Sequence, residues 1–267
     1  MVHLGAERGW DKRVQLAADL ADRFQSALIG TAGWLPMPAF ALDDIAIDDK
    51  TIDSERQKMV DLLAEMEEKF RASAKHVNHL EWRGTLDYPR DLVPRESRAA
   101  DLLIIGRESV PGDPYFSLNP GITILRAGRP VLVVPDGVES LAARRIVVAW
   151  KDTRESRRAT SDALPFLRKA EEVIIVEVCE RGAEVQSQKQ INDVADYLAR
   201  HKVVVGAKIF LRAEQSVANE LLRVTKDEKA DLVVAGGYGH SRLGEWIFGG
   251  VTRDLLVNSP VCCLFSH

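Results

Sequence analysis

Residues 230–236 read ADLVVAG, and residues 100–106 read ADLLIIG, an offset of 130 positions. The same offset places residues 130–134, PVLVV, on residues 260–264, PVCCL. Two separate matches at one spacing indicate an internal repeat. Each matched piece is a short, continuous apolar run with Gly or Pro at one end, which is typical of a strand buried on both faces of a parallel sheet.

Helical patterns separate the apolar runs in the second copy. We expect strands at 145–150, 172–178, 203–211, 231–237 and 261–265, and helices at 155–170, 186–202, 216–230 and 251–257. Right-handed crossovers turn such an alternation into a doubly wound parallel sheet. An unrelated α/β domain of the same class remains an alternative on this pattern alone.

The first copy repeats this order less regularly. We expect helices at 9–24, at 51–77 and near 91–100, and strands at 27–33, 77–82, 101–106 and 130–134. Residues 34–50 have no counterpart and are predicted to be an inserted surface loop or lid. Before the first helix, only Val2 to Leu4 are present at the place of the first strand of the second copy. Either this very short strand is sufficient for the sheet, or the sequence starts too late and lacks part of the strand. The expected domains are residues 1–136 and 145–267, joined by a linker at 136–145.

Composition restricts the classes of partner. The chain has 267 residues, 46% of them hydrophobic, and a formal net charge of −4, which favours two domains and gives no basic excess for nucleic acid. No apolar run approaches the roughly 20 residues that span a bilayer, and the first residues lack the apolar stretch of a signal peptide, so we expect a cytoplasmic protein without a membrane partner. The histidines and three cysteines show no metal-ligand spacing, and we expect reduced core cysteines and no metal site.

Six glycines lie between residues 236 and 253. A glycine-rich turn between a strand and a helix allows backbone N–H groups to converge on an anion, and the helix N-terminus adds positive potential. Arg242 excludes a Rossmann fingerprint that begins at Gly237, and Gly250 stands where a P-loop requires Lys. The spacing that remains is Gly236, two residues, Gly239, nine residues, Gly249.

This spacing resembles the ATP-binding signature of the universal stress protein family. Residues 146–159, IVVAWKDTRESRRA, also resemble the first strand, loop and helix of that family. The resemblance covers residues 145–267 and, through the repeated strands, extends to the first copy. It implies two doubly wound domains of the adenine nucleotide alpha hydrolase-like fold, with strand order 3-2-1-4-5, packed as an intramolecular pseudo-dimer that can associate further into a homodimer.

The family pattern assigns roles to positions near the two loops. It implies that Gly236, Gly239 and Gly249 surround the phosphates, with backbone N–H contacts near Gly239, His240 and Gly250. Gly250 stands where ATP-binding members usually carry Ser or Thr, and Thr252 either supplies that hydroxyl or caps the helix. In the loop after the first strand, the segment with Ala149 and Trp150 would meet adenine and ribose, Lys151 replaces the usual adenine-contacting acid, and a one-residue shift would bring Asp152 to that contact.

The first copy lacks the same glycines. At the 130 offset Ser109 replaces Gly239, while Asn119 and Pro120 replace Gly249 and Gly250. Pro120 has no N–H to donate. We therefore expect this copy to bind no nucleotide through that loop.

The sequence predicts a stress-response protein that binds ATP, ADP or AMP, with or without Mg, in its second domain and acts in signalling or protection. Catalysis would be slow ATP hydrolysis at most, since His240 belongs to no nucleophile motif and we expect no catalytic residue. The alternative is a nucleotide-free interaction or dimerisation protein of the same fold.

Overall fold

The computed structural model describes residues 1–5, 9–35, 49–107, 118–179, 182–211, 216–239 and 250–267. The N-terminal half contains β1 (Val2–His3), α1 (Trp10–Phe24), β2 (Leu28–Gly33), α2 (Asp49–Ser73), β3 (Leu80–Thr85), α3 (Pro89–Glu96), a 3₁₀ turn (Ser97–Ala99), β4 (Leu103–Gly106), α4 (Pro120–Ala127) and β5 (Val131–Val134). The C-terminal half contains β6 (Arg145–Ala149), α5 (Arg154–Asp162), α6 (Leu164–Leu167), β7 (Glu172–Cys179), α7 (Glu184–Arg200), β8 (Val205–Leu211), α8 (Val217–Asp227), β9 (Leu232–Gly236), α9 (Gly250–Asn258) and β10 (Cys262–Ser266).

The strands form one sheet in the order β3-β2-β1-β4-β5-β10-β9-β6-β7-β8. Counted within each half, both orders read 3-2-1-4-5, and the neighbours inside each half are parallel. The α/β class predicted from the sequence is confirmed. The sheet differs from the expectation in one detail, because the two five-stranded sheets are continuous.

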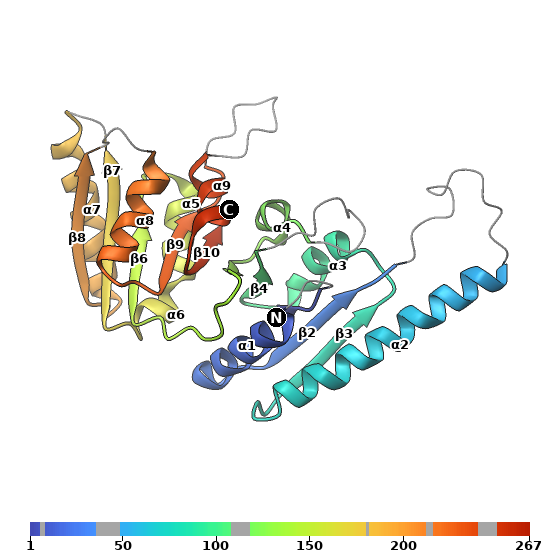
Figure 1. Cartoon of the computed structure of the whole chain (residues 1–267). Coiled ribbons are helices and arrows are strands. Elements are labelled where there is room, and N and C mark those ends of the chain that lie inside the picture. Colours follow the sequence, from blue (N-terminus) through green and yellow to red (C-terminus); the bar gives the residue numbers. More distant parts are fainter. Residues whose placement is uncertain (6–8, 36–48, 108–117, 180–181, 212–215, 240–249) are drawn as a thin grey trace, which may run out of the picture.

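The joint between the halves is the antiparallel pair β5 and β10, where Val133 lies opposite Cys263 and Val131 opposite Phe265. Figure 1 shows the two halves side by side, with β10 facing the N-terminal half. An open apolar strand edge invites a partner, and the family resemblance implies that the two copies pack as an intramolecular pseudo-dimer. The structure contains this pairing within one chain.

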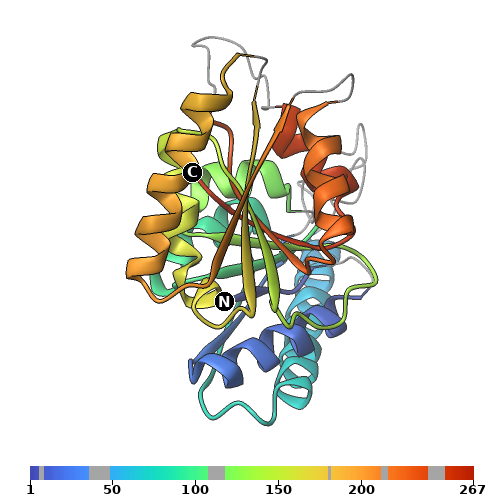
Figure 2. The same ribbon diagram turned by 90° about the vertical axis from the view of Figure 1, so that its left-hand side faces the viewer.

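Helices cover both faces of the sheet. The core on one face includes residues of α1, α2, α5, α6 and α7, and the core on the other face includes residues of α3, α4, α8 and α9. Figure 2 views the C-terminal half with α7 and α8 on opposite sides of its strands. Both cores run through both halves, and Phe24 of α1 meets Phe166 of α6 edge to face at 5.0 Å between ring centroids. The halves therefore share their hydrophobic cores.

The first strand of the N-terminal half is a stub of two residues, and it pairs with β2 on one side and β4 on the other. The segment between β5 and β6 is partly packed, since Leu141 and Ala143 are buried in the core. Part of the predicted insertion, residues 36–48, lies outside the described residues.

Two helices differ from the expectation. The single helix expected at 155–170 is divided into α5 and α6, and Pro165 lies at the start of α6. Proline has no N–H to continue the helical ladder and its ring crowds the preceding turn, which explains the division. Helix α4 was not predicted, although Asn119 and Pro120 are typical N-cap and N1 residues.

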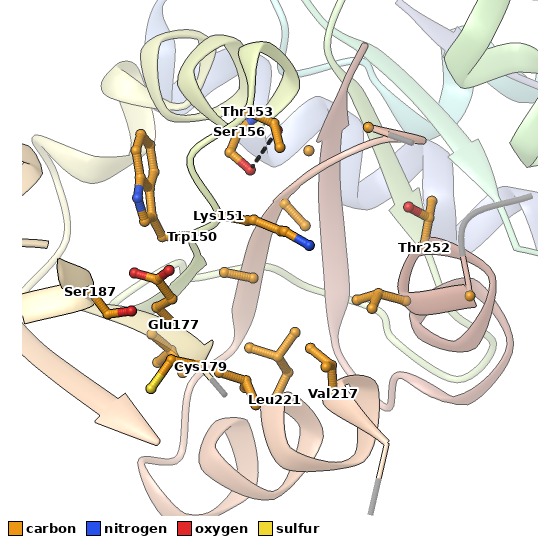
Figure 3. A pocket seen from close by; sticks show the side chains of 18 of the residues that line it. Trp150, Lys151, Thr153, Ser156, Glu177, Cys179, Ser187, Val217, Leu221 and Thr252 are labelled. Carbon is orange, nitrogen blue, oxygen red and sulfur yellow. Dashed lines mark hydrogen bonds between the residues drawn. The ribbon is translucent and has the colours of Figure 1, made fainter. Parts of the chain in front are cut away.

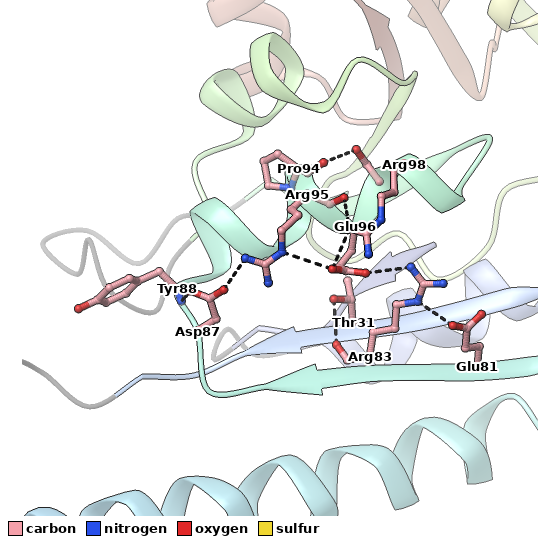
Figure 4. Close-up of polar contacts among 10 residues, drawn as sticks. Thr31, Glu81, Arg83, Asp87, Tyr88, Pro94, Arg95, Glu96 and Arg98 are labelled. Carbon is pink, nitrogen blue, oxygen red and sulfur yellow. Dashed lines mark hydrogen bonds and ion pairs between the residues drawn. The ribbon is translucent and has the colours of Figure 1, made fainter.

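A buried carboxylate fastens α3 to the edge of the N-terminal sheet. Glu96 is 9% exposed and accepts hydrogen bonds from Arg83 at 2.9 Å, Arg98 at 3.1 Å and Arg95 at 3.4 Å (Figure 4). Arg83 comes from β3 and is itself only 23% exposed. Burial raises the pKa of Glu96, but the hydrogen bonds from the three guanidinium groups outweigh it and hold the pKa below its usual range.

Candidate functional site

A cavity of about 590 Å³ lies at the carboxyl ends of β6, β7 and β9, where parallel α/β sheets bind their ligands (Figure 3). Its wall combines glycines, hydroxyl groups, apolar side chains and charged side chains: Ala149, Trp150, Lys151, Thr153, Ser156, Val176, Glu177, Val178, Cys179, Ala183, Ser187, Val217, Leu221, Ala235, Gly236, Gly239, Gly250, Val251 and Thr252.

The loop after β9 packs closely against the start of α5. A Cβ atom added to Gly236 would lie 2.7 Å from the backbone N of Ser156 and 2.8 Å from the carbonyl C of Glu155. At Gly239 an added Cβ would lie 2.9 Å from Oε2 of Glu155. At Gly236 the close atoms belong to the backbone, so this position requires glycine for lack of space rather than for a left-handed backbone. At Gly239 the close atom is the end of a side chain, which can move aside.

The backbone between these glycines is held by α9. Tyr238 has a φ of +58°, and its N–H donates to Oγ1 of Thr252 at 3.2 Å. Tyr238 is 9% exposed, and burial raises its pKa to about 12. Thr252 lies in the first turn of α9, where its hydroxyl fastens the loop; it is not the N-cap residue.

Two helices begin at the cavity wall. Thr153 caps α5, its Oγ1 accepting from the N–H of Ser156 at 3.3 Å. Helix α9 begins at Gly250, which also lines the cavity. Each N-terminus carries partial positive charge and backbone N–H groups that lack helical partners. Together they make this end of the cavity suitable for an anion.

Lys151 and Glu177 are the two charged side chains in the lining that the structure describes. In Figure 3 the side chain of Lys151 points toward Thr252, and Glu177 lies beside Ser187. Burial raises the pKa of Glu177, as does the charge of Asp152, whereas Ser187 and Lys151 lower it. Oε2 of Glu177 is buried and has no hydrogen-bond partner among the described residues. The cavity therefore has a cationic end and an acidic end.

Apolar side chains form the wall between these ends. Val176 and Val178 come from β7, and Val217 and Leu221 come from α8. Such a wall suits a flat hydrophobic group, while the few polar groups fix its orientation.

A buried carboxylate also lies near the glycine loop. The side chain of Glu155 is 4% exposed and pairs with Arg154. Burial raises the pKa of Glu155, but hydrogen bonds from Arg154, from its own backbone N–H and from Thr153 outweigh burial and hold the pKa below its usual range. Glu155 is therefore ionised and neutralised within the helix start.

The structure brings together most of the residues predicted from the sequence. Ala149, Trp150, Gly236, Gly239, Gly250 and Thr252 all line the cavity. Asp152 is not among the lining residues, and its carboxylate pairs with Arg157, with 3.1 Å between Oδ1 and Nε. His240 and Gly249 lie outside the described residues.

Sequence reasoning missed Glu177 and Ser187. Glu177 is an acidic residue near the carboxyl end of a strand that is otherwise apolar after its first residue, Glu172, and this was the available signal. Ser187 lies one turn into α7, and nothing in its sequence environment indicates a site.

The corresponding positions of the N-terminal half are different. The side chain of Asn119 accepts from the N–H of Ile122 at 3.0 Å and so caps α4, while Pro120 occupies the first helical position. By strand register Leu4 and Ala32, both completely buried, stand where the other half has Trp150 and Glu177. The N-terminal half therefore has buried apolar side chains at these two positions, and the carboxylate of Glu177 has no counterpart there.

In the described part of the chain, no group of three or more His, Cys, Asp or Glu side chains is placed to hold a metal ion. None of the helices described is both long enough and apolar enough to cross a membrane.

The comparisons with known proteins concern the family and the fold. The model of the universal stress protein family matches residues 142–266. The chain is similar to the crystal structure of a universal stress protein from Archaeoglobus fulgidus DSM 4304, at 17% identity, 99% coverage of this chain, 94% of that chain and a TM-score of 0.62. It is also similar to a functionally unknown protein from Pseudomonas aeruginosa PAO1, at 13% identity, 98% and 91% coverage and a TM-score of 0.56. At these identities the likeness concerns the fold, and no curated protein matches the sequence.

Proposed function

Because residues 142–266 belong to the universal stress protein family, we propose that the C-terminal half binds an adenine nucleotide and that the protein acts in a stress response as a nucleotide-dependent signalling or protective protein. The observation that carries this proposal is the polarity of the cavity. Two helix N-termini and Lys151 form one end, and Glu177 with apolar walls forms the other. A nucleotide has the same polarity, with anionic phosphates at one end and a flat base bearing an N–H donor at the other.

The residues take the following roles in this proposal. Backbone N–H groups near Gly236, Gly239, His240, Gly249 and Gly250 surround the phosphates. Lys151 supplies positive charge at the phosphate end, with Mg or without it, and Thr252 positions the loop. The base and ribose lie against Ala149, Trp150 and the wall formed by β7 and α8. No side chain in this arrangement is assigned to catalysis, and hydrolysis would be slow at most.

Purified protein should gain stability from ATP. At an ATP concentration 100 times Kd the free energy of unfolding should rise by about 2.7 kcal/mol. For a chain of this size the melting temperature should rise by about 5 °C or more. Titration calorimetry should give one nucleotide per chain, because the N-terminal half lacks the glycine loop. No shift at millimolar ATP would favour the alternative, a nucleotide-free interaction protein.

Two glycine variants, one in the cavity and one outside it, test whether ATP binds in this cavity. Gly239→Val should abolish the ATP-dependent shift because its side chain enters the cavity, while the fold tolerates it because the nearest atom is the end of the Glu155 side chain. Gly206→Val on β8 is the control, since a Cβ there meets no described atom closer than 3.9 Å and the position does not line the cavity. An unchanged shift in Gly239→Val would move the nucleotide elsewhere.

A gain of affinity is expected at Gly250, where the family usually has a hydroxyl. An added Cβ at Gly250 meets no atom of the described residues within 4 Å, so Ser fits against them without strain. A hydroxyl that donates to a phosphate oxygen should tighten ATP binding about 10-fold. Titration calorimetry of Gly250→Ser and Gly250→Ala separates the hydroxyl from the added methyl, and equal affinities of the two variants would contradict the phosphate placement.

A further inference from the structure

The glycine loop of the C-terminal half touches the N-terminal half directly. Gly237 follows β9, is buried, and donates its N–H to the carbonyl O of Ser266 at 2.8 Å. A Cβ atom on Gly237 would lie 2.7 Å from Cγ2 of Ile124, which belongs to α4. Ile124 is 1% exposed. One methyl group of the N-terminal half therefore packs against bare backbone in the loop.

The loop is held on a second side by its own half. The N–H of Tyr238, the next residue, donates to Oγ1 of Thr252 in α9. Gly237 and Tyr238 thus lie between two fixed groups, Ile124 and Thr252. Gly236 and Gly239 flank them and line the cavity. A shift of this backbone by a few tenths of an ångström would also move Gly236 and Gly239, which line the cavity, and binding geometry tolerates only about 0.5 Å of error.

The equivalent loop of the N-terminal half, which follows β4, contacts the C-terminal half in a different way. At the 130 offset Arg107 corresponds to Gly237, and Asp254 corresponds to Ile124. Arg107 sends its guanidinium across the joint to the carbonyl O of Ser259 at 2.8 Å. The close packing of a methyl group on loop backbone is therefore found on the side that has the glycine loop and the cavity.

We propose that the N-terminal half positions the nucleotide-binding loop of the C-terminal half, with Ile124 as the positioning residue and Gly237 as its contact. This inference rests on the proposed function, and it assigns a task to the half that lacks the glycine loop. Because coupling between two sites is reciprocal, nucleotide binding in the C-terminal half also strengthens the packing between the halves.

Two substitutions at Ile124 separate its methyl group from its bulk. Ile124→Leu removes Cγ2 and keeps the side-chain volume, whereas Ile124→Val keeps Cγ2 and loses Cδ1. Gly237→Ala should weaken ATP binding about 10-fold, because its Cβ collides with Cγ2. The double variant Gly237→Ala with Ile124→Leu should return to within about threefold of the wild type, and the double variant with Ile124→Val should not. Leu125→Ala, on the same helix and 41% exposed, is the control that leaves affinity unchanged.

A second readout needs no nucleotide. Hydrogen exchange of the Tyr238 amide should become faster in Gly237→Ala and should slow again when Ile124→Leu is added. Absence of ATP binding by the wild type would refute the proposed function, while the exchange rates would still report on positioning. Additive effects of the two substitutions on the exchange rate, or on affinity where ATP binds, would overturn the positioning role of Ile124.

Discussion

Gly236→Ala is expected to lower the free energy of unfolding by about 2–3 kcal/mol and to abolish the stabilisation by ATP. The added methyl would lie 2.7 Å and 2.8 Å from backbone atoms of Ser156 and Glu155, and backbone cannot rotate away as a long side chain can. Helix α5 must therefore shift away from β9. Thr153 and Ser156 would move with it, and both line the cavity.

Gly250→Ala is the matched control for this prediction. It adds the same methyl group at the other helix start of the cavity, where no atom of the part of the chain that the structure describes lies within 4 Å. Urea unfolding should show a free-energy change within about 0.5 kcal/mol for Gly250→Ala. Equal stability of both variants would mean that β9 and α5 are not in the close contact described here.

Glu96→Gln should be the most damaging charge change in the N-terminal half, at about 2–3 kcal/mol of unfolding free energy. It leaves three guanidinium groups around a neutral amide that donates as well as accepts. Removing one partner from a fully buried ion pair costs about 3–5 kcal/mol. The expected loss is smaller because Arg95 and Arg98 are 51% and 63% exposed and are partly solvated. Glu81→Gln is the control: Glu81 also pairs with Arg83 but is 52% exposed, so the cost should stay below about 1 kcal/mol.

The pH dependence has a definite sign. The folded-state pKa of Glu96 lies below the ordinary value of 4.5. Its contribution to stability is therefore complete above about pH 4.5 and is lost as the pH falls through the folded-state pKa. Urea unfolding of the wild type and Glu96→Gln should give a constant difference from pH 5 to 7 and a shrinking one below pH 4.5. A difference that grows on acidification would show that Glu96 is not held in its ionised form.

Strands such as β4, β5, β9 and β10 were predictable because each is a short buried apolar run, which leaves a continuous signature in the sequence. The repeat at a spacing of 130 related β4 to β9 and β5 to β10 before any pairing was known. The helix boundaries were less predictable, because the residues of α5 and α6 form one amphipathic pattern and only Pro165 divides it. Helix α4 was missed, although its first residues carry a recognisable cap.

The parts of the candidate site that lie close together in the sequence were predictable. The parts that meet only through the pairing of strands were less predictable. Gly236 and Gly239 are recognisable from their spacing directly after an apolar strand, and both residues line the cavity. Glu177 reaches the wall because its position near the carboxyl end of β7 adjoins the end of β6, a relation that needs the pairing of the two strands. Lys151 lines the cavity, whereas its neighbour Asp152 pairs with Arg157. This difference depends on how the loop turns into α5.

The joint between β5 and β10 also determines when the sheet can be completed during synthesis. β5 ends at Val134, and its partner begins at Cys262, so about 130 further residues must be made before the two strands can meet. At roughly 5–20 residues per second this interval is on the order of 10 s. Throughout it the edge of β5, whose four residues are all buried in the finished protein, stays open to other strands. The apolar edge of the newly made N-terminal half is therefore covered only when the last strand of the sheet has been made.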